Sequence, residues 1–302
     1  MPCYNAAPHL PRSVGSVLAQ SFTDWELITV DDGSTDNTLG WLQAHPHPQL
    51  RIHTQPNQGV SAARNAGLAH AQGRYVAFLD ADDTWAPDFL THMVAALETS
   101  PDAVLAYCGW QNIGLSGALA EPFIPPDYET PDKAQTLFAG CRWPIHAVLV
   151  HHAAIKATGG FDPRLKNAED YALWLNLAIP APITRVPAVL VYYHFHGDAQ
   201  ASANKASAAL QFWHAQQDYL TRHPVFSDQL GAKLTNRLTH GTLLQKGYTL
   251  YWKRDLLAAR RIFRHVMRQG YGTLSDWKYM LPAWLPESWH RLMIKVLETR
   301  EN

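Results

Sequence analysis

The sequence predicts an α/β protein built on a doubly wound, mostly parallel sheet and followed by a helical C-terminal region. Short apolar segments alternate with helical patterns over residues 10–110, as parallel strands require because a helix usually makes each crossover. Two apolar segments end in clustered aspartates, and open α/β sheets bind ligands at the carboxyl ends of their strands. The length of 302 residues allows one domain of about 200 residues and a smaller region.

The elements of this sheet can be placed from their spacing. Leu10, Val14 and Val17 recur at helical spacing, Asp36 is suited to cap a helix, and Gly73 to follow one. The expected helices cover residues 10–20, 36–45, 58–71 and 87–99, and the expected strands lie at 25–30, near 52, at 75–79 and at 103–108.

The pattern loosens after residue 110. Residues 114–133 are rich in glycine and proline and predict a loop, and prolines at 180–187 lead into a strand at 189–193. From about residue 205 the chain reads as helical. We therefore expect a catalytic domain over residues 1–200 and a C-terminal helical region over residues 201–302.

A doubly wound sheet normally opens with an apolar strand that becomes central. Here Met1-Pro2-Cys3-Tyr4-Asn5 opens the sequence, so we expect the first strand to be missing or truncated. Such a gap would open a trough between the neighbouring strands, and we expect an apolar segment rich in Val and Ile upstream of Pro2.

Composition narrows the class of protein. A formal net charge of −1 gives no general basic field, which argues against nucleic acid as a partner. Cys3, Cys108 and Cys141 are scattered without metal-ligand spacing, which suits a reducing cytoplasm. The sequence shows neither a signal peptide nor an apolar run of 18 residues.

The strongest chemical signal is the acidic end of the strand at 75–79. Asp80, Asp82 and Asp83 follow it directly, and alternation lets Asp80 and Asp82 point the same way and share one divalent cation. Carboxylate oxygens favour Mg²⁺ or Mn²⁺, which commonly also bind a diphosphate. The alternative is a polar turn that caps the next helix, but a cap needs one such residue rather than three.

Taken together, residues 2 to about 200 closely resemble the family 2 glycosyltransferases of the GT-A fold. The resemblance rests on motifs in the family's order: PCYN at 2–5, VDDGSTD at 30–36, NQGVSAARNAG at 57–67, DADD at 80–83, TGGFD at 158–162, Glu169-Asp170, and Trp174. It implies transfer of a sugar from a nucleotide diphosphate donor with inversion at the anomeric carbon.

The resemblance implies roles for the donor-binding residues. Asp32 would accept the N–H of a pyrimidine base, Tyr4 would pack on the base, and Arg64 would hold a phosphate or the base. Asp80 would reach the ribose or the metal. A UDP-sugar is therefore the expected donor.

Further residues are assigned to the metal and to catalysis. Asp82 would bind the metal, and His196 stands where the family has a histidine suited to the metal or the diphosphate. The alternative for His196 is simple packing. Glu169 and Asp170 supply the general base, with Asp170 preferred and Glu169 orienting it or contacting the acceptor. The pair could equally be first-turn acids favoured by the helix dipole.

These observations predict a metal-dependent inverting glycosyltransferase that builds a bacterial surface glycan on a glycan or lipid-linked acceptor. A non-catalytic nucleotide-sugar-binding relative is the alternative, because a missing strand could cripple the site. A nucleotidyltransferase is a third, weaker reading, since the N-terminal region has no glycine-rich phosphate loop.

The C-terminal region suggests where the enzyme works. Residues 253–300 hold ten Lys or Arg against four acids, a net charge of +6. Ile262, Val266 and Met267 are interleaved with arginines, and several tryptophans follow. Aromatic and basic side chains on short helices suit an anionic membrane surface, so we expect a cytoplasmic protein that binds peripherally to the cytoplasmic face of the inner membrane. The alternative is that the aromatics pack internally and the arginines are solvated.

Overall fold

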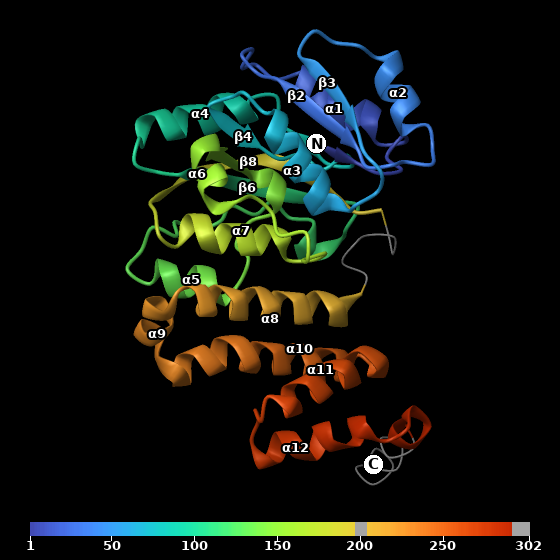
Figure 1. Cartoon of the computed structure of the whole chain (residues 1–302), viewed down its shortest axis with the longest axis vertical. Coiled ribbons are helices and arrows are strands. Elements are labelled where there is room, and N and C mark those ends of the chain that lie inside the picture. Colours follow the sequence, from blue (N-terminus) through green and yellow to red (C-terminus); the bar gives the residue numbers. More distant parts are fainter. Residues whose placement is uncertain (197–203, 292–302) are drawn as a thin grey trace. The chain divides into compact units, whose positions relative to one another are not determined.

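The computed structural model describes residues 1–196 and 204–291. By its internal contacts the chain divides into two compact units, residues 1–200 and 201–302. Figure 1 shows strands and helices in the first unit and helices in the second.

The first unit opens with a parallel sheet of three strands in the order β1-β2-β3. The strands are β1 (Pro2–Cys3), β2 (Leu27–Asp31) and β3 (Leu50–Thr54), and the helices are α1 (Leu10–Leu18), α2 (Thr38–Ala44) and α3 (Val60–His70). Leu10, Val14 and Val17 are buried on one face of α1, as their helical spacing predicts. Each crossover is a helix, which is the arrangement that parallel pairing demands.

The second sheet of the same unit is mixed, with strand order β4-β7-β6-β8-β5. Its strands are β4 (Tyr75–Ala77), β5 (Thr84–Trp85), β6 (Leu105–Ile113), β7 (Val148–His151) and β8 (Ile183–His194). Only β6 and β8 run parallel within it, and the other three pairs are antiparallel. The α/β class is therefore confirmed, while parallel pairing is concentrated in the first sheet. The helical elements beside it are α4 (Phe89–Thr99), η1 (Gly117–Leu119), α5 (Lys133–Ala139), η2 (Ile145–Ala147), α6 (His152–Thr158) and α7 (Glu169–Ala178).

Strand β8 begins earlier than its prolines suggest. Its pairing with β6 passes from Val186 directly to Val189, so Pro187 falls in a bulge where its missing N–H is not needed. A Cβ on Gly109, which pairs with Val189, would lie 2.9 Å from the Ala188 carbonyl oxygen. Glycine therefore allows the two strands to approach at the bulge.

The first strand is short, as expected, and a large cavity lies beside it. Strand β1 has two residues, and a cavity of about 800 Å³ between β2 and β4 is lined by Leu27, Val76 and Phe78 among other, mostly apolar side chains. These side chains line a partly open hollow, in contrast to the close packing that is normal for protein interiors.

The second unit is helical throughout its described part. Its elements are α8 (Lys205–Arg222), α9 (Pro224–Asn236), η4 (Arg237–Gly241), α10 (Thr242–Trp252), α11 (Leu256–Arg268), α12 (Leu274–Met280) and η5 (Leu281–Trp284). Among the residues described, none of the helices combines the length and apolar character needed to cross a membrane.

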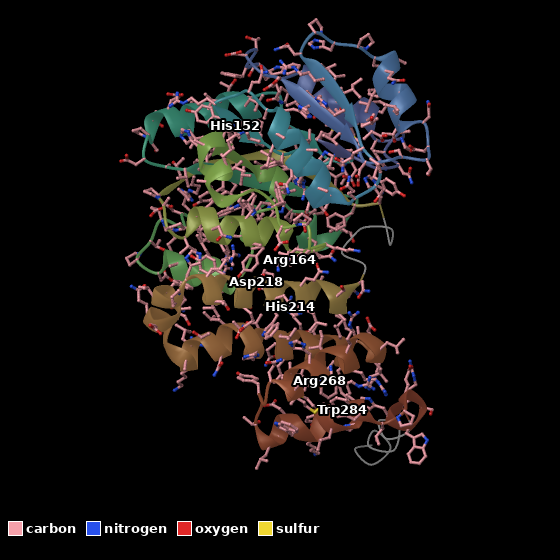
Figure 2. The ribbon with its side chains drawn as sticks, in the orientation of Figure 1. His152, Arg164, His214, Asp218, Arg268 and Trp284 are labelled. Carbon is pink, nitrogen blue, oxygen red and sulfur yellow. The ribbon has the colours of Figure 1, made fainter. Side chains whose placement is uncertain are left out.

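Three apolar side chains of helix α11 do not face a membrane surface, contrary to the prediction from the sequence. Ile262, Val266 and Met267 are buried in the core of this helical unit. On the same helix Arg264 donates to the Ala283 carbonyl over 2.7 Å, and the guanidinium groups of Arg264 and Arg268 lie over the Trp284 ring at 5.5 and 5.2 Å. Figure 2 labels Arg268 and Trp284 in this contact. These apolar residues serve packing, so only exposed side chains remain for a surface.

Candidate active site

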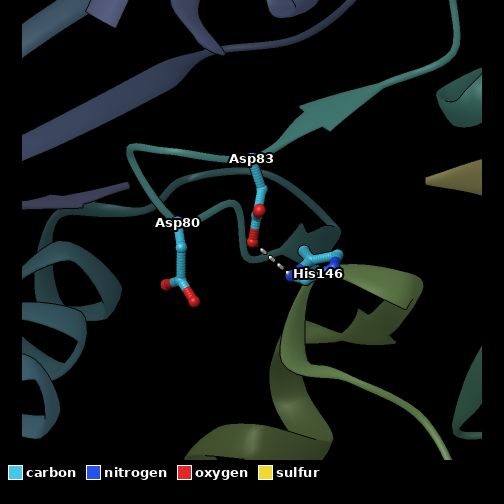
Figure 3. A group of neighbouring side chains, drawn as sticks. All are labelled: Asp80, Asp83 and His146. Atoms are coloured by element: carbon cyan, nitrogen blue, oxygen red, sulfur yellow. Dashed lines mark ion pairs between the residues drawn. The ribbon is translucent and has the colours of Figure 1, made fainter. Parts of the chain in front are cut away.

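A buried ion pair anchors the acidic loop between β4 and β5. Asp83 accepts a hydrogen bond from the His194 N–H at 2.8 Å, and its other oxygen lies 3.0 Å from Nδ1 of His146. Figure 3 shows this pair, with Asp80 beside it on the same loop. Burial opposes a charge on His146, but the neighbouring Asp83 raises the pKa of His146 above its ordinary value. Sequence reasoning missed His146 because no local pattern links it to an aspartate so far away in the chain.

Arg64 of α3 joins the acidic loop to the start of α7. Its guanidinium donates to Asp80 and to Glu169, each over 2.8 Å, and its side chain is 4% exposed. Burial works against this charge, but Asp80 and then Glu169 raise the pKa of Arg64. Burial likewise opposes ionisation of Asp80, but Arg64 holds its pKa below the ordinary value. Two expected site residues from different motifs are thereby brought together.

Asp82 is the acid of this loop with the least compensated charge. Its carboxylate lies 3.8 Å from Nε2 of His196, and the two side chains are 37% and 28% exposed. Burial, and then the charges of Asp83 and Asp80, raise the pKa of Asp82 to about 6. A divalent cation would relieve this repulsion, so the donor set fits Mg²⁺ or Mn²⁺.

A second set of atoms could also hold a cation: Asp80, Asp83 and His146 offer ligand atoms within 4.8 Å of one another. Both oxygens of Asp83 already face His194 and His146, and Asp83 and His146 are enclosed at 1% and 0% side-chain exposure. A cation that also binds a diphosphate needs positions open to solvent. The more open Asp82 and His196 therefore suit it better, and Asp80 is common to both sets.

The structure places Asp32 and Tyr4 at the end of the first sheet. Asp32 is buried, and its carboxylate accepts from Gln55 Nε2 at 2.7 Å, the Gln58 N–H at 2.9 Å and the Gly59 N–H at 2.8 Å. A carboxylate has about four acceptor positions, so one remains for a ligand. Tyr4 is 53% exposed, and its ring is free to pack against one.

Glu169 and Asp170 occupy the first turn of α7, after Ala168 at φ 103°. This left-handed conformation strains a residue with a Cβ, and such strain is common beside functional groups. Arg64 binds Glu169, whereas Asp170 accepts from the Tyr171 N–H at 2.6 Å and from the Cys141 thiol at 3.8 Å. Burial, and then the charge of Glu169, raise the pKa of Asp170 to about 6.

Comparisons with known proteins agree with this arrangement. The family model described as Glycosyl transferase family 2 matches residues 1–135. The putative teichuronic acid biosynthesis glycosyltransferase TuaG of Bacillus subtilis is 35% identical over 182 residues, 58% of this chain and 69% of TuaG. The chain belongs to glycosyl transferase family 2. Its class of activity is therefore glycosyl transfer.

For other relatives of this family 2 glycosyltransferase, the matched share of the relative's own length varies widely. The Escherichia coli UDP-Glc:alpha-D-GlcNAc-diphosphoundecaprenol beta-1,3-glucosyltransferase WfgD is 27% identical over 73% of this chain and 85% of WfgD. Escherichia coli chondroitin synthase is 30% identical over 66% of this chain, but the match spans 29% of that synthase.

Solved structures show the same fold at low identity. The mannosyltransferase PcManGT from Pyrobaculum calidifontis, in complex with GDP-Man and Mn²⁺, matches with a TM-score of 0.58, 19% identity, and coverage of 97% of this chain and 81% of that one. Part of S. aureus TarS in complex with UDP-GlcNAc matches with a TM-score of 0.57, 19% identity, and coverage of 87% and 81%. The α/β fold with mixed sheets is that of GT-A glycosyltransferases.

Proposed function

We propose that this glycosyltransferase is a metal-dependent, inverting hexosyltransferase that uses a nucleotide diphosphate sugar, with a UDP-sugar the expected donor. One observation carries the proposal: Arg64 holds Asp80 of the acidic loop and Glu169, the neighbour of Asp170, in a single cluster. The acceptor is a glycan or a lipid-linked sugar in bacterial surface polysaccharide synthesis. The names of TuaG and WfgD, which refer to teichuronic acid biosynthesis and to a diphosphoundecaprenol-linked sugar, support that context.

The donor would lie between the first sheet and the acidic loop. Asp32 and Tyr4 would bind the base, and Arg64 and Asp80 would face the ribose or phosphates. Asp82, Asp80 and His196 would hold Mg²⁺ or Mn²⁺. A bound cation would neutralise charge that develops on the departing diphosphate.

Asp170 would act as the general base. A direct displacement needs one carboxylate to take the proton of the acceptor hydroxyl as that oxygen attacks. Asp170 can do so because its carboxylate is not tied to Arg64, whereas Glu169 is. Glu169 would orient the pair or contact the acceptor.

The helical unit would bring the enzyme to its acceptor at a membrane surface. Trp252 and Leu257 are 60% and 65% exposed, and Lys253 and Arg261 beside them are exposed cations. We call these four residues the basic-apolar patch. Such a patch suits an anionic surface and would place a cytoplasmic protein peripherally on the cytoplasmic face of the inner membrane.

The function can be tested by incubating the protein with Mn²⁺ and a panel of nucleotide sugars and measuring the free nucleoside diphosphate. We expect release from one donor class, dependence on the metal and loss after chelation. Binding of a nucleotide sugar without release, with or without oligosaccharide acceptors, would favour the non-catalytic alternative. Transfer of the nucleotidyl group, with release of the sugar 1-phosphate instead, would indicate a nucleotidyltransferase.

A further inference from the structure

An open cavity of about 270 Å³ lies beside Asp170, and no ligand has yet been assigned to it. One wall comes from two paired strands. Trp110 and Asn112 alternate along β6, and Tyr193 on β8 and Phe195 just beyond it continue the same alternation. Asn112 pairs directly with Tyr193, and the Phe195 N–H donates to the Ile113 carbonyl over 2.8 Å. Because side chains two apart share a sheet face, this register gathers three aromatic rings on one wall.

The facing wall is formed by residues 141–144. Trp143 is 2% exposed and stacks on Tyr107 with ring centroids 4.6 Å apart, so its position is rigid. Its indole N–H is buried without a hydrogen-bond partner among the described residues. Cys141 and Asp170 complete the cavity where the thiol approaches the carboxylate. A buried donor without a partner costs free energy unless a ligand or water satisfies it.

The lining selects one chemical class of ligand. A sugar ring presents C–H groups on its faces, which pack on aromatic rings, and hydroxyls on its edge, which need a few donors and acceptors such as Asn112 and Asp170. An anionic group such as a polyol phosphate would need free cations. Arg142 is the one cation of this lining, and its Nε and Nη2 both donate to the Thr136 carbonyl. The size of the cavity suits one sugar unit rather than a chain.

We propose that this cavity binds the terminal sugar of the acceptor, stacked on Trp110 and Phe195 with its reacting hydroxyl directed at Asp170. The inference rests on the proposed function and adds the acceptor class and the residues that select it. In the transfer, the acceptor oxygen forms a bond to the anomeric carbon as the bond from that carbon to the diphosphate oxygen breaks. The hydroxyl proton passes to Asp170, and the bonding electron pair leaves with the nucleoside diphosphate.

The first test needs no turnover. Cys141 is exposed while Cys3 and Cys108 are buried, so alkylation by iodoacetamide can report on the cavity. Although Cys141 is exposed as a residue, burial of its thiol end and then Asp170 raise the thiol pKa, so the reaction should be run at alkaline pH. We expect short oligosaccharides from a panel of surface-glycan sugars to slow alkylation of Cys141, and ribitol phosphate not to. Protection by ribitol phosphate alone, or by no sugar in the panel, would overturn the proposal.

Substitutions of Trp110 test whether the sugar binds in this cavity. Trp110→Ala should raise the sugar concentration for half protection, and the acceptor KM, by about tenfold, whereas Trp110→Phe keeps a ring and should restore most of the affinity. Release of nucleoside diphosphate to water without acceptor should be unchanged in both. Trp41→Ala, which removes an aromatic from α2 outside the cavity, is the matched control.

The proposed function and the proposed acceptor site can be refuted separately. If the wild-type protein releases no nucleoside diphosphate from any donor, the proposed function fails while sugar protection of Cys141 can still hold. If transfer occurs but Trp110→Ala, folded by its melting curve, keeps the wild-type acceptor KM, the acceptor site is elsewhere.

Discussion

At the scale of single residues, Asp82 carries the clearest prediction. In the described part of the chain its carboxylate lies 3.8 Å from Nε2 of His196, whereas Arg64 binds Asp80 at 2.8 Å and His146 lies 3.0 Å from Asp83. Asp82→Ala should abolish transfer and weaken Mn²⁺ binding while the fold is kept, because the loop is anchored through Asp83. A variant that retains more than about a tenth of the wild-type rate, about 1.4 kcal/mol, would contradict the metal role. Asp102→Ala, an exposed acid elsewhere, is the control.

The raised pKa of Asp170 predicts how the transfer rate depends on pH. Its pKa is about 6, and only the carboxylate form can take the acceptor proton. The transfer rate at saturating Mn²⁺ should therefore rise as the pH increases through about 6 and level off above it. Glu169→Gln should move this inflection to lower pH because it removes a neighbouring negative charge.

The raised pKa of Asp170 also affects stability. Its contribution to the free energy of unfolding falls with increasing pH, whereas the transfer rate rises. A carboxyl whose pKa is raised on folding stabilises the native state below its unfolded pKa, and this contribution is lost as the pH rises through about 6. Asp170→Asn should remove that loss and abolish turnover, while donor and metal binding persist. If Glu169→Gln is inactive and Asp170→Asn is active, Glu169 is the base.

At the scale of elements, helix α3 offers a stabilising change. Gly67 lies in its interior, and a Cβ there would meet only Val30 Cγ2 at 3.6 Å, an ordinary contact. Gly67→Ala should raise the free energy of unfolding by about 0.5–1 kcal/mol through helix propensity, measured by urea titration. Gly159→Ala is the matched control and should destabilise, because Gly159 ends α6 at φ 82°.

Most elements follow from local sequence, and their deviations have physical causes. Helices α1, α2, α3 and α4 lie within the expected ranges because apolar periodicity and turn residues are local signals. Strand β8 is longer than predicted because Pro187 is absorbed by a bulge against Gly109, a pairing that requires knowledge of the partner strand.

At the scale of the whole molecule, membrane association is the testable property. The intact chain should bind vesicles containing anionic lipid at low salt and be released at high salt, since each basic residue near the surface contributes about 1 kcal/mol and salt screens it. Lys253→Glu with Arg261→Glu should abolish binding in vesicle sedimentation, whereas Lys156→Glu in the first unit should not.

A deletion of residues 250–302 would not test membrane binding cleanly. That deletion would remove Leu256, Ile262 and Phe263 from the core of the helical unit and would unfold it. An intact chain that ignores anionic vesicles at low ionic strength would show that the helical unit serves packing or oligomerisation. Lys295 and Arg300, which also belong to the +6 segment, lie outside the described residues.

The sequence by itself determined the α/β class and the family, and it supplied the acids that we propose for the donor site, because periodicity, clustered aspartates and ordered motifs are all local. Only the tertiary structure decided how those acids are used. Arg64 binds both Asp80 and Glu169, His146 lies 3.0 Å from Asp83, and rings from β6 and the end of β8 form a wall beside Asp170. The tertiary structure also buries Ile262 and Val266 in the core of the helical unit. Each of these contacts joins residues that only folding brings together, and charge compensation and burial depend on such neighbours rather than on position along the chain.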